Sequence, residues 1–219
     1  MSTLAILPVK SFAGAKRRLA DELEPGPRRA LAEAMFSDVL LALRRVPTLD
    51  EVLVVSSDRG AQRIAGGYGA TVLADEERGH NAAATAGVRA ALAQRYERAL
   101  LVPGDCPLLD PQQLEELLAR PTGPPSVLIV PDRHGTGTNA LLLAPPDAMA
   151  PAFGPGSCRR HASQAQSHRI EHEVVELSSL ALDVDTPDDL ATLQATLTTI
   201  HGHAAHTRGM LNQLMRSRA

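Results

Sequence analysis

Carboxylates stand at two places in this 219-residue sequence where they could bind a metal ion. Asp105 directly follows an apolar stretch, residues 99–102, in a turn that contains glycine and proline. Asp183 and Asp185 alternate within the segment 182–186, so in an extended strand their side chains would share one face. Carboxylate oxygens are the ligands that Mg²⁺ prefers, and paired carboxylates can share one ion or a metal pair. The three aspartates are therefore the candidate metal ligands.

Helix capping is the alternative role for acidic residues in these two segments. Asp110 precedes a proline and is expected to cap the helix that begins there. Thr186 or Asp185 could likewise cap a helix that begins at the next proline, so both roles stay open for Asp185. Capping explains neither Asp105 nor Asp183, and a ligand role is favoured for these two.

A cationic segment, residues 10–18, is the second candidate for chemistry. It contains Lys10, Lys16, Arg17 and Arg18 and no acidic residue. Charged hydrogen bonds to phosphate oxygens are stronger than neutral ones, so this composition suits a polyphosphate. The segment lacks the G-x-x-x-x-G-K-[ST] pattern of a P-loop. A solvated basic loop remains the alternative interpretation.

Two glycine-rich loops could receive an acidic substrate. The first, residues 135–139, offers the hydroxyl of Thr138, and the apolar run that follows it predicts a strand. A dinucleotide-binding G-x-G-x-x-G would need a helix there, so we reject that interpretation. The second loop contains Gly154 and Ser157 and leads into a predicted helix, whose first N–H groups are preset for a phosphate or carboxylate.

Other reactive residue types do not form recognisable sites. His80, His134 and His161 are expected in loops, mostly at the surface, and no spacing supports zinc. Cys106 is expected to be a small packing residue, because no cation stands near it in sequence. Ser157 lacks the nucleophile-elbow pattern, which argues against a serine hydrolase.

Composition narrows the class of protein. Hydrophobic residues make up 44% and charged residues 21%, which is typical of a folded chain. The formal net charge of -3, with three Phe, two Tyr and no Trp, argues against a nucleic-acid partner. Two cysteines are too few for a disulfide framework, and no apolar run reaches the roughly 18–20 residues that span a bilayer. We expect a cytoplasmic protein that contacts no membrane.

Strand-like and helix-like stretches alternate along the chain. This alternation predicts an α/β fold, a mixed but mostly parallel sheet flanked by helices, in one domain over residues 1–200. Residues 201–219 are expected to form a frayed C-terminal tail or a loosely docked helix. In such sheets ligands collect at the carboxyl ends of the strands. The expected strands are 4–9, 51–56, 70–73, 99–102, 126–130, 139–143, 170–177 and 180–184, and the expected helices are 25–46, 61–65, 81–96, one beginning at 111, and 187–197.

Five motifs follow one another along the chain, LPVKSFAGAKRRLA, GDCPLLD, GTGTNALLL, FGPGS and LDVDTPDDL. In this order they resemble the guanylyltransferases of coenzyme F420 biosynthesis, which act on 2-phospho-L-lactate or phosphoenolpyruvate. The resemblance covers roughly residues 4–197 and implies the nucleotide-diphospho-sugar transferase fold, which is Rossmann-like. It implies an enzyme that uses GTP and Mg²⁺ to place GMP on a small phosphorylated three-carbon acid, such as 3-phosphoglycerate, releasing pyrophosphate. Whether the enzyme forms a homodimer stays open.

The resemblance also implies roles for individual residues. Lys10, Lys16 and Arg18 would face the GTP phosphates, and Asn81 lies in the stretch 79–83 that resembles the base-reading loop of this fold. The catalytic residues would be Lys16 and Asp105. The three candidate metal ligands, Asp105, Asp183 and Asp185, would hold Mg²⁺, and Thr138, Gly154 and Ser157 would bind the phosphate and carboxylate of the acceptor.

A mechanism follows from charge. The second pKa of a phosphate monoester is about 6, so the acceptor is mostly a dianion at neutral pH and can attack the α-phosphorus of GTP directly. No general base is required. Fixed cations and metal would hold the two anions together and stabilise the leaving pyrophosphate.

Three alternatives remain. A sugar-1-phosphate nucleotidyltransferase would share the chemistry but usually carries a glycine-rich signature that is missing here. In molybdenum-cofactor guanylyltransferases an L-x-G-G-x-S-x-R-x-G stretch stands where this chain has Pro8, Val9 and Lys10. The third alternative is a non-catalytic nucleotide-binding protein on the same fold.

Overall fold

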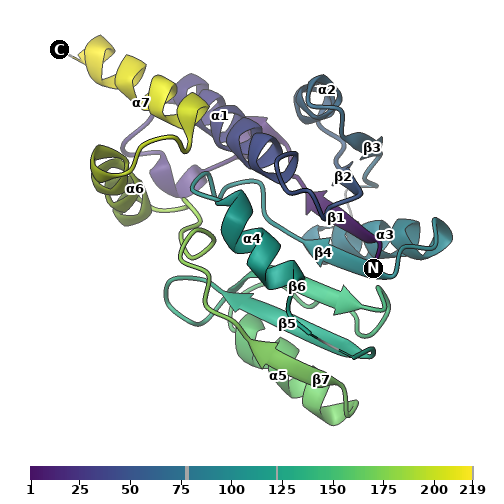
Figure 1. The fold of residues 1–219 in the computed structure, drawn as a ribbon. Coiled ribbons are helices and arrows are strands. Elements are labelled where there is room, and N and C mark those ends of the chain that lie inside the picture. The colour runs from purple at the N-terminus through teal and green to yellow at the C-terminus, as the bar shows by residue number, and fades with distance from the viewer. Residues whose placement is uncertain (77–78, 122, 219) are drawn as a thin grey trace.

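The apolar stretches expected to be strands build a seven-stranded sheet in the computed structural model, which describes residues 1–76, 79–121 and 123–218 (Figure 1). The strand order is β3-β2-β1-β4-β6-β5-β7. The strands are β1 (Thr3–Pro8), β2 (Glu51–Val55), β3 (Thr71–Leu73), β4 (Arg98–Leu101), β5 (Ser126–Pro131), β6 (Thr138–Ala144) and β7 (Glu171–Val174).

One strand of this sheet runs against the others. β1 pairs in parallel with β2 and β4, whereas β6 lies antiparallel to both β4 and β5. The loop between β5 and β6 is too short for the crossover that a parallel pair needs, so β6 must return in the opposite direction. The prediction of a mixed, mostly parallel sheet is confirmed.

Helices alternate with most of the strands. The α-helices are α1 (Pro25–Leu43), α2 (Arg59–Gly67), α3 (His80–Ala93), α4 (Pro111–Leu118), α5 (Ser157–Ser167), α6 (Pro187–Thr199) and α7 (Ala205–Arg218), with 3-10 turns η1 (Phe12–Gly14) and η2 (Arg17–Leu19). Asp110 caps α4, as expected. At α6 the cap is Thr186, which forms a capping box with Asp189, so Asp185 is left for another role.

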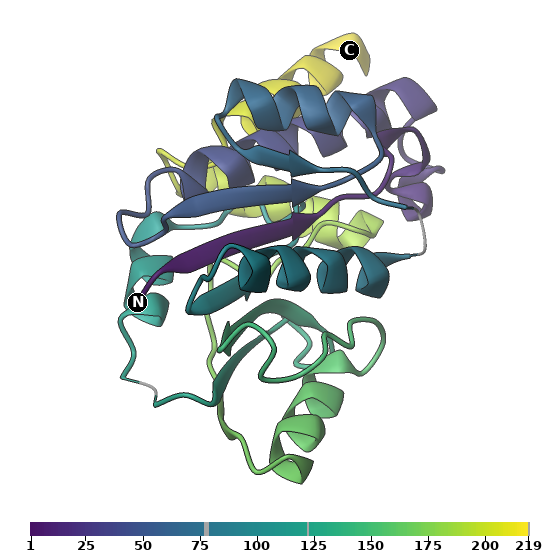
Figure 2. The ribbon, with the colours of Figure 1, turned by 90° about the vertical axis from the view of Figure 1, so that its right-hand side faces the viewer.

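The helices cover both faces of the sheet (Figures 1 and 2). Residues of α1, α2 and α4 share one core cluster with Ala5 and Leu7, and residues of α3 and α5 share another with Leu4 and Ile6. This division follows the alternation of side chains along β1. On the α3 face, a Cβ at Gly87 would lie 2.3 Å from Cγ2 of Ile6, so only glycine allows the close packing of α3 on β1.

The C-terminal residues form a docked helix. Leu211 of α7 belongs to a third apolar cluster together with Met35 of α1 and Leu193 of α6, and Figure 1 shows α7 lying along α1. Asp38 of α1 accepts hydrogen bonds from the N–H groups of His206 and Thr207 in the first turn of α7. The expectation of a frayed tail is therefore wrong and that of a docked helix is right, while the domain boundary at residue 200 stays a prediction.

Among the described residues, no helix is both long and apolar enough to cross a membrane.

Candidate functional site

Three loops meet at the carboxyl edge of the parallel strands. They follow β1, follow β4 and precede α6. The N–H of Val184 donates to the carbonyl of Asp105 at 3.2 Å, and the buried Cys106 thiol donates to the carbonyl of Leu180 at 3.7 Å. The strand expected at 180–184 does not form, because this segment pairs with the turn after β4 and not with a neighbouring strand. The convergence of the aspartates comes from this loop pairing, and the alternation of a strand plays no part.

Lys16 lies at the centre of the site. Its Nζ donates to Oδ2 of Asp105 at 2.5 Å and to Oδ1 of Asp185 at 2.9 Å. Its side chain is only 7% exposed, against 28% for Asp105 and 46% for Asp185. Lys16 holds a left-handed backbone conformation, with φ of 54°, that turns its side chain at the start of η2. Such a conformation costs a non-glycine residue roughly 1–2 kcal/mol, so the surrounding contacts must hold it.

The charges in this cluster are strongly coupled. Burial acts to lower the pKa of Lys16, but the charges of Asp105 and Asp185 outweigh it and raise the pKa, so the ammonium stays protonated. Burial and the charge of Asp105 raise the pKa of Asp183, while a hydrogen bond from Asn139 opposes that rise. Nδ2 of Asn139 lies 3.1 Å from Oδ1 of Asp183 and 2.7 Å from the carbonyl of Leu180. Asn139 therefore holds both the loop and the carboxylate.

Two adjoining pockets open beside this cluster. The first, of about 360 Å³, is lined by Lys10 and Lys16 from the β1 loop and by Asp105 and Asp185. The second, of about 230 Å³, shares with it the wall formed by residues 8–11 and His80. The two pockets therefore adjoin along residues 8–11 and His80, with the charged cluster at the first of them.

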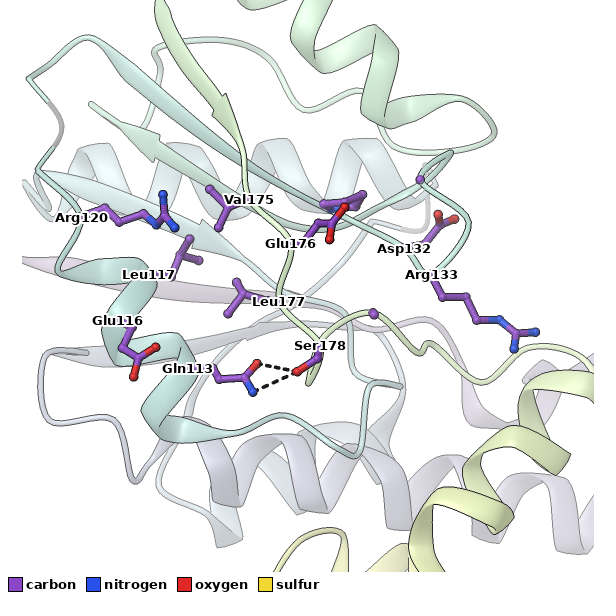
Figure 3. Close-up of a pocket in the computed structure, with 13 residues that line it drawn as sticks. Gln113, Glu116, Leu117, Arg120, Asp132, Arg133, Val175, Glu176, Leu177 and Ser178 are labelled. Carbon is purple, nitrogen blue, oxygen red and sulfur yellow. Dashed lines mark hydrogen bonds between the residues drawn. The ribbon is translucent and has the colours of Figure 1, made fainter. Parts of the chain in front are cut away.

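A larger cavity lies elsewhere, between α4 and the segment that follows β7 (Figure 3). Its volume is about 860 Å³, and none of the predicted site residues is among the described residues that line it. In its lining, the side-chain amide of Gln113 forms hydrogen bonds with the hydroxyl of Ser178, which dashed lines mark in Figure 3. Because the charged cluster around Lys16 lies at the two smaller pockets, these are the candidate site.

The donor set of the site fits Mg²⁺. Within residues 1–76, 79–121 and 123–218, no group of three or more His, Cys, Asp or Glu is arranged as a complete metal cage. Asp105 and Asp185, however, both reach one ammonium group, and Mg²⁺ is usually held by one or two carboxylates together with water and substrate phosphates. The carboxylates of Asp105 and Asp185, which line the first pocket, match that incomplete coordination. The assignment of metal ligands stays a prediction.

The predicted nucleotide-binding residues do not all gather here. Lys10 lines both pockets. Arg18 is exposed on η2 and is not among the described residues that line either pocket. The side-chain amide of Asn81 is engaged with the backbone of Phe153, accepting from its N–H at 2.7 Å and donating to its carbonyl at 3.1 Å. Asn81 thus ties α3 to the loop before α5.

Thr138, one of the predicted acceptor-binding residues, belongs to a neutral cluster around His161. Contrary to the expectation of a loop histidine, His161 is fully buried within α5. Its Nε2 accepts from the N–H of Ala152 at 2.9 Å, which leaves Nδ1 to donate to Oγ1 of Thr138 at 3.0 Å. Burial, with the charge of Arg160, lowers the pKa of His161 to about 4. The ring is therefore neutral at physiological pH.

Gly154 and Ser157 shape the turn before α5. Gly154 has a φ of 123°, a conformation suited to glycine, and its carbonyl accepts from the N–H of Ser157 at 3.0 Å. The helix begins at Ser157 after Gly156, as the sequence predicts. Ser157 is almost completely buried.

Sequence reasoning missed several polar residues of the site. Asp75 and Ser57 line the second pocket, and each follows a strand end, β3 and β2 respectively. That position was the available signal, the same one that singled out Asp105. The role of Asn139 in positioning Asp183 could not be predicted from the sequence, because the two residues are 44 positions apart in the chain.

Known proteins with similar sequences share a chemical class. A phosphoenolpyruvate guanylyltransferase of Conexibacter woesei is 56% identical over 99% of this chain and 98% of its own length. A 3-phospho-D-glycerate guanylyltransferase of Colwellia psychrerythraea is 37% identical, over 88% of this chain and 91% of its own. A 2-phospho-L-lactate guanylyltransferase of Methanothermobacter thermautotrophicus is 35% identical, over 98% and 92%.

Solved structures agree on the fold. A protein described as a nucleotide-diphospho-sugar transferase from Desulfovibrio desulfuricans superposes with a TM-score of 0.76, at 16% identity over 97% of this chain and 95% of that one. At this identity the likeness speaks for the fold alone, and it confirms the expected nucleotide-diphospho-sugar transferase architecture. The model of the guanylyl transferase family, CofC-like, matches residues 3–217, so the chain is a nucleotidyltransferase that belongs to this CofC-like family.

Proposed function

We propose that this enzyme transfers GMP from GTP to the phosphate of phosphoenolpyruvate, with release of pyrophosphate, as a step of coenzyme F420 biosynthesis. The relative that is 56% identical carries phosphoenolpyruvate in its name, whereas those named for 3-phosphoglycerate and 2-phospho-L-lactate are 37% and 35% identical. The observation that carries the proposal is the meeting of Lys16 with Asp105 and Asp185 in the lining of one pocket.

The reaction needs a balanced exchange at one phosphorus atom. A phosphate oxygen of the acceptor forms a new bond to the α-phosphorus of GTP, and the bond from that phosphorus to the bridging oxygen of the β-phosphate breaks. Pyrophosphate takes the electron pair. The acceptor phosphate has a second pKa of about 6, so it attacks as a dianion and no side chain has to remove a proton. A reaction that needs no general base agrees with a site that is rich in charged side chains.

The residues of the first pocket would then position and neutralise phosphates. Lys16 and Lys10 provide fixed positive charge beside the triphosphate, and such charge is most effective where water is partly excluded. Asp105 and Asp185, with Asp183 beside them, would hold Mg²⁺, whose chemistry here is to neutralise phosphate charge and stabilise the leaving group. Lys16 is free to turn from the carboxylates to phosphate oxygens once their charge is balanced.

The acceptor would bind toward α5. Oγ1 of Thr138 accepts from His161, which leaves its own proton to donate to a carboxylate or phosphate oxygen. The turn from Gly154 to Ser157 lies at the N-terminus of α5, where the helix dipole favours an anion. β6 begins at Thr138, and the neighbouring Asn139 contacts Asp183, so the two parts of the site adjoin.

The test is release of pyrophosphate from GTP and Mg²⁺ in the presence of one acceptor at a time: phosphoenolpyruvate, 2-phospho-L-lactate, 3-phosphoglycerate or a hexose-1-phosphate. We expect the highest kcat/KM with phosphoenolpyruvate and no turnover with the sugar phosphate. Equal or better turnover of a sugar phosphate would favour the sugar nucleotidyltransferase alternative. No pyrophosphate from any three-carbon acid would overturn the proposal.

A further inference from the structure

The second pocket adjoins the first, and its described lining does not include Asp105 or Asp185. It is lined by residues 8–11 of the β1 loop, Ser57 after β2, Asp75 after β3, and Gly79 and His80 at the start of α3. The first pocket holds Lys16, Asp105 and Asp185 at its far end. A nucleotide whose phosphates lie beside those charges therefore has its base and sugar directed into the second pocket.

Asp75 is the acidic side chain that lines this second pocket. It is half-buried, and its charge is close enough to act on the ring of His80, whose pKa burial and the charge of Lys10 lower. Across residues 1–76, 79–121 and 123–218, no hydrogen bond or ion pair engages the carboxylate of Asp75. Its two oxygens are thus available to a ligand in the pocket.

Guanine is the base whose hydrogen-bonding edge matches such a carboxylate. On its Watson–Crick edge, N1–H and the exocyclic N2 amine are adjacent donors, which one carboxylate can accept together. Adenine and cytosine place an acceptor nitrogen beside their single amine, and uracil flanks its one donor with two carbonyls. A buried carboxylate facing any of these three would be left with an unpaired or repelled oxygen, which is costly.

We propose that Asp75 is the residue that selects guanine, by accepting from N1–H and N2 of the GTP base. This inference rests on the proposed function of the site. His80 lines both pockets, and its ring packs edge-to-face on Phe153 at 5.3 Å, so it lies where the proposed base site meets the phosphate site. Asp75 would thus make this chain selective for guanine, on a fold that binds different nucleotides.

Inosine triphosphate tests this assignment, because it differs from GTP only by the missing N2 amine. The experiment compares kcat/KM and equilibrium binding for GTP, inosine triphosphate and ATP in the wild-type protein, in Asp75→Ala and in Asp75→Asn. We expect the wild type to favour GTP over inosine triphosphate by about tenfold to a hundredfold, the effect of a charge-assisted hydrogen bond. In Asp75→Ala that ratio should fall to near one, and in Asp75→Asn it should lie between.

A matched control is Glu76→Gln, which removes the neighbouring carboxylate, one that does not line the pocket. Its GTP-to-inosine ratio should equal that of the wild type. If Asp75→Ala and Asp75→Asn keep the wild-type ratio, or if the wild type uses the two nucleotides equally, the inference is overturned although the enzyme is a guanylyltransferase. Absence of any GTP turnover in the wild type would instead contradict the proposed function. Thermal unfolding checks that each variant is folded, and Asp75→Asn keeps the side-chain volume should Asp75→Ala fail.

Discussion

Two polar clusters lie at the same edge of the sheet, and they are built in opposite ways. In the first, a buried ammonium on Lys16 bridges the carboxylates of Asp105 and Asp185, both of which reach solvent. In the second, His161 is fully buried and neutral, and both its ring nitrogens are engaged, by Ala152 and Thr138. One cluster is charged and open, and the other is neutral and closed.

The difference separates groups that exchange partners from groups that hold positions. Charged groups that line a pocket can exchange their contacts with one another for contacts with phosphate or metal, because those ligands carry the complementary charges. A buried neutral network holds its members in place, and changing His161 leaves its partners at Ala152 and Thr138 unpaired. Variants in the first cluster should therefore alter catalysis, and variants in the second should alter stability.

The largest expected effect is on catalysis, from Asp105→Asn. Loss of this charge removes a proposed metal ligand, and kcat/KM for pyrophosphate release should fall by about 10²–10³-fold, the size of effect that loss of a group stabilising the transition state produces. The variant should remain folded, because Lys16 keeps its contact with Asp185.

Asp110→Asn is the matched control, because Asp110 lies in the same segment but caps α4. Its activity should stay within about twofold of the wild type, since asparagine also caps helices well. Equal losses of activity in the two variants would mean that the segment acts only through its fold.

The second effect is on stability and concerns pH. The folded-state pKa of His161 is about 4, against 6.5 for an exposed histidine, so between these values the unfolded chain binds a proton that the folded chain does not. The free energy of unfolding should fall as pH drops from 6.5 to 4, by up to about 3 kcal/mol from this residue. Urea unfolding at pH 7.5 and 4.5 measures the loss.

His161→Gln removes the titrating ring. The variant therefore distinguishes the contribution of His161 from that of other groups that titrate in the same pH range. The variant should be less stable than the wild type at pH 7.5 and lose less further stability on acidification. If wild type and variant lose the same free energy between the two pH values, His161 is not held neutral as described.

The smallest effect is expected at the link between the clusters. Asn139→Ala removes the hydrogen bonds to Asp183 and to the carbonyl of Leu180. Because partners that orient metal ligands affect metal affinity by about 10–100-fold, the Mg²⁺ concentration for half-maximal activity should rise by about tenfold. Gln113→Ala, which frees the same chain segment at Ser178 in the larger cavity (Figure 3), should not raise it. A similar rise in both variants would indicate general loosening of the segment.

Periodicity and strand-end positions predicted most of the fold and the charged cluster. The strand β1, helix α1 and the cap at Asp110 follow from local pattern, and Lys16 and Asp105 stood out because each comes from a loop after a strand. The prediction of a strand at 180–184 was wrong, because hydrogen bonds to residues distant in the sequence determine the backbone conformation of this segment. The burial of His161 was not predicted either, since nothing near this residue in the sequence indicates its contact with Thr138.

The charged cluster is the central claim, and binding of Mn²⁺ with GTP tests it most directly. Mn²⁺ substitutes for Mg²⁺ at oxygen ligands and has an electron paramagnetic resonance spectrum that changes on binding. The wild type should bind the Mn²⁺–GTP complex at least tenfold more tightly than a protein carrying both Asp105→Asn and Asp185→Asn. Equal affinities of the two proteins for the Mn²⁺–GTP complex would contradict the account.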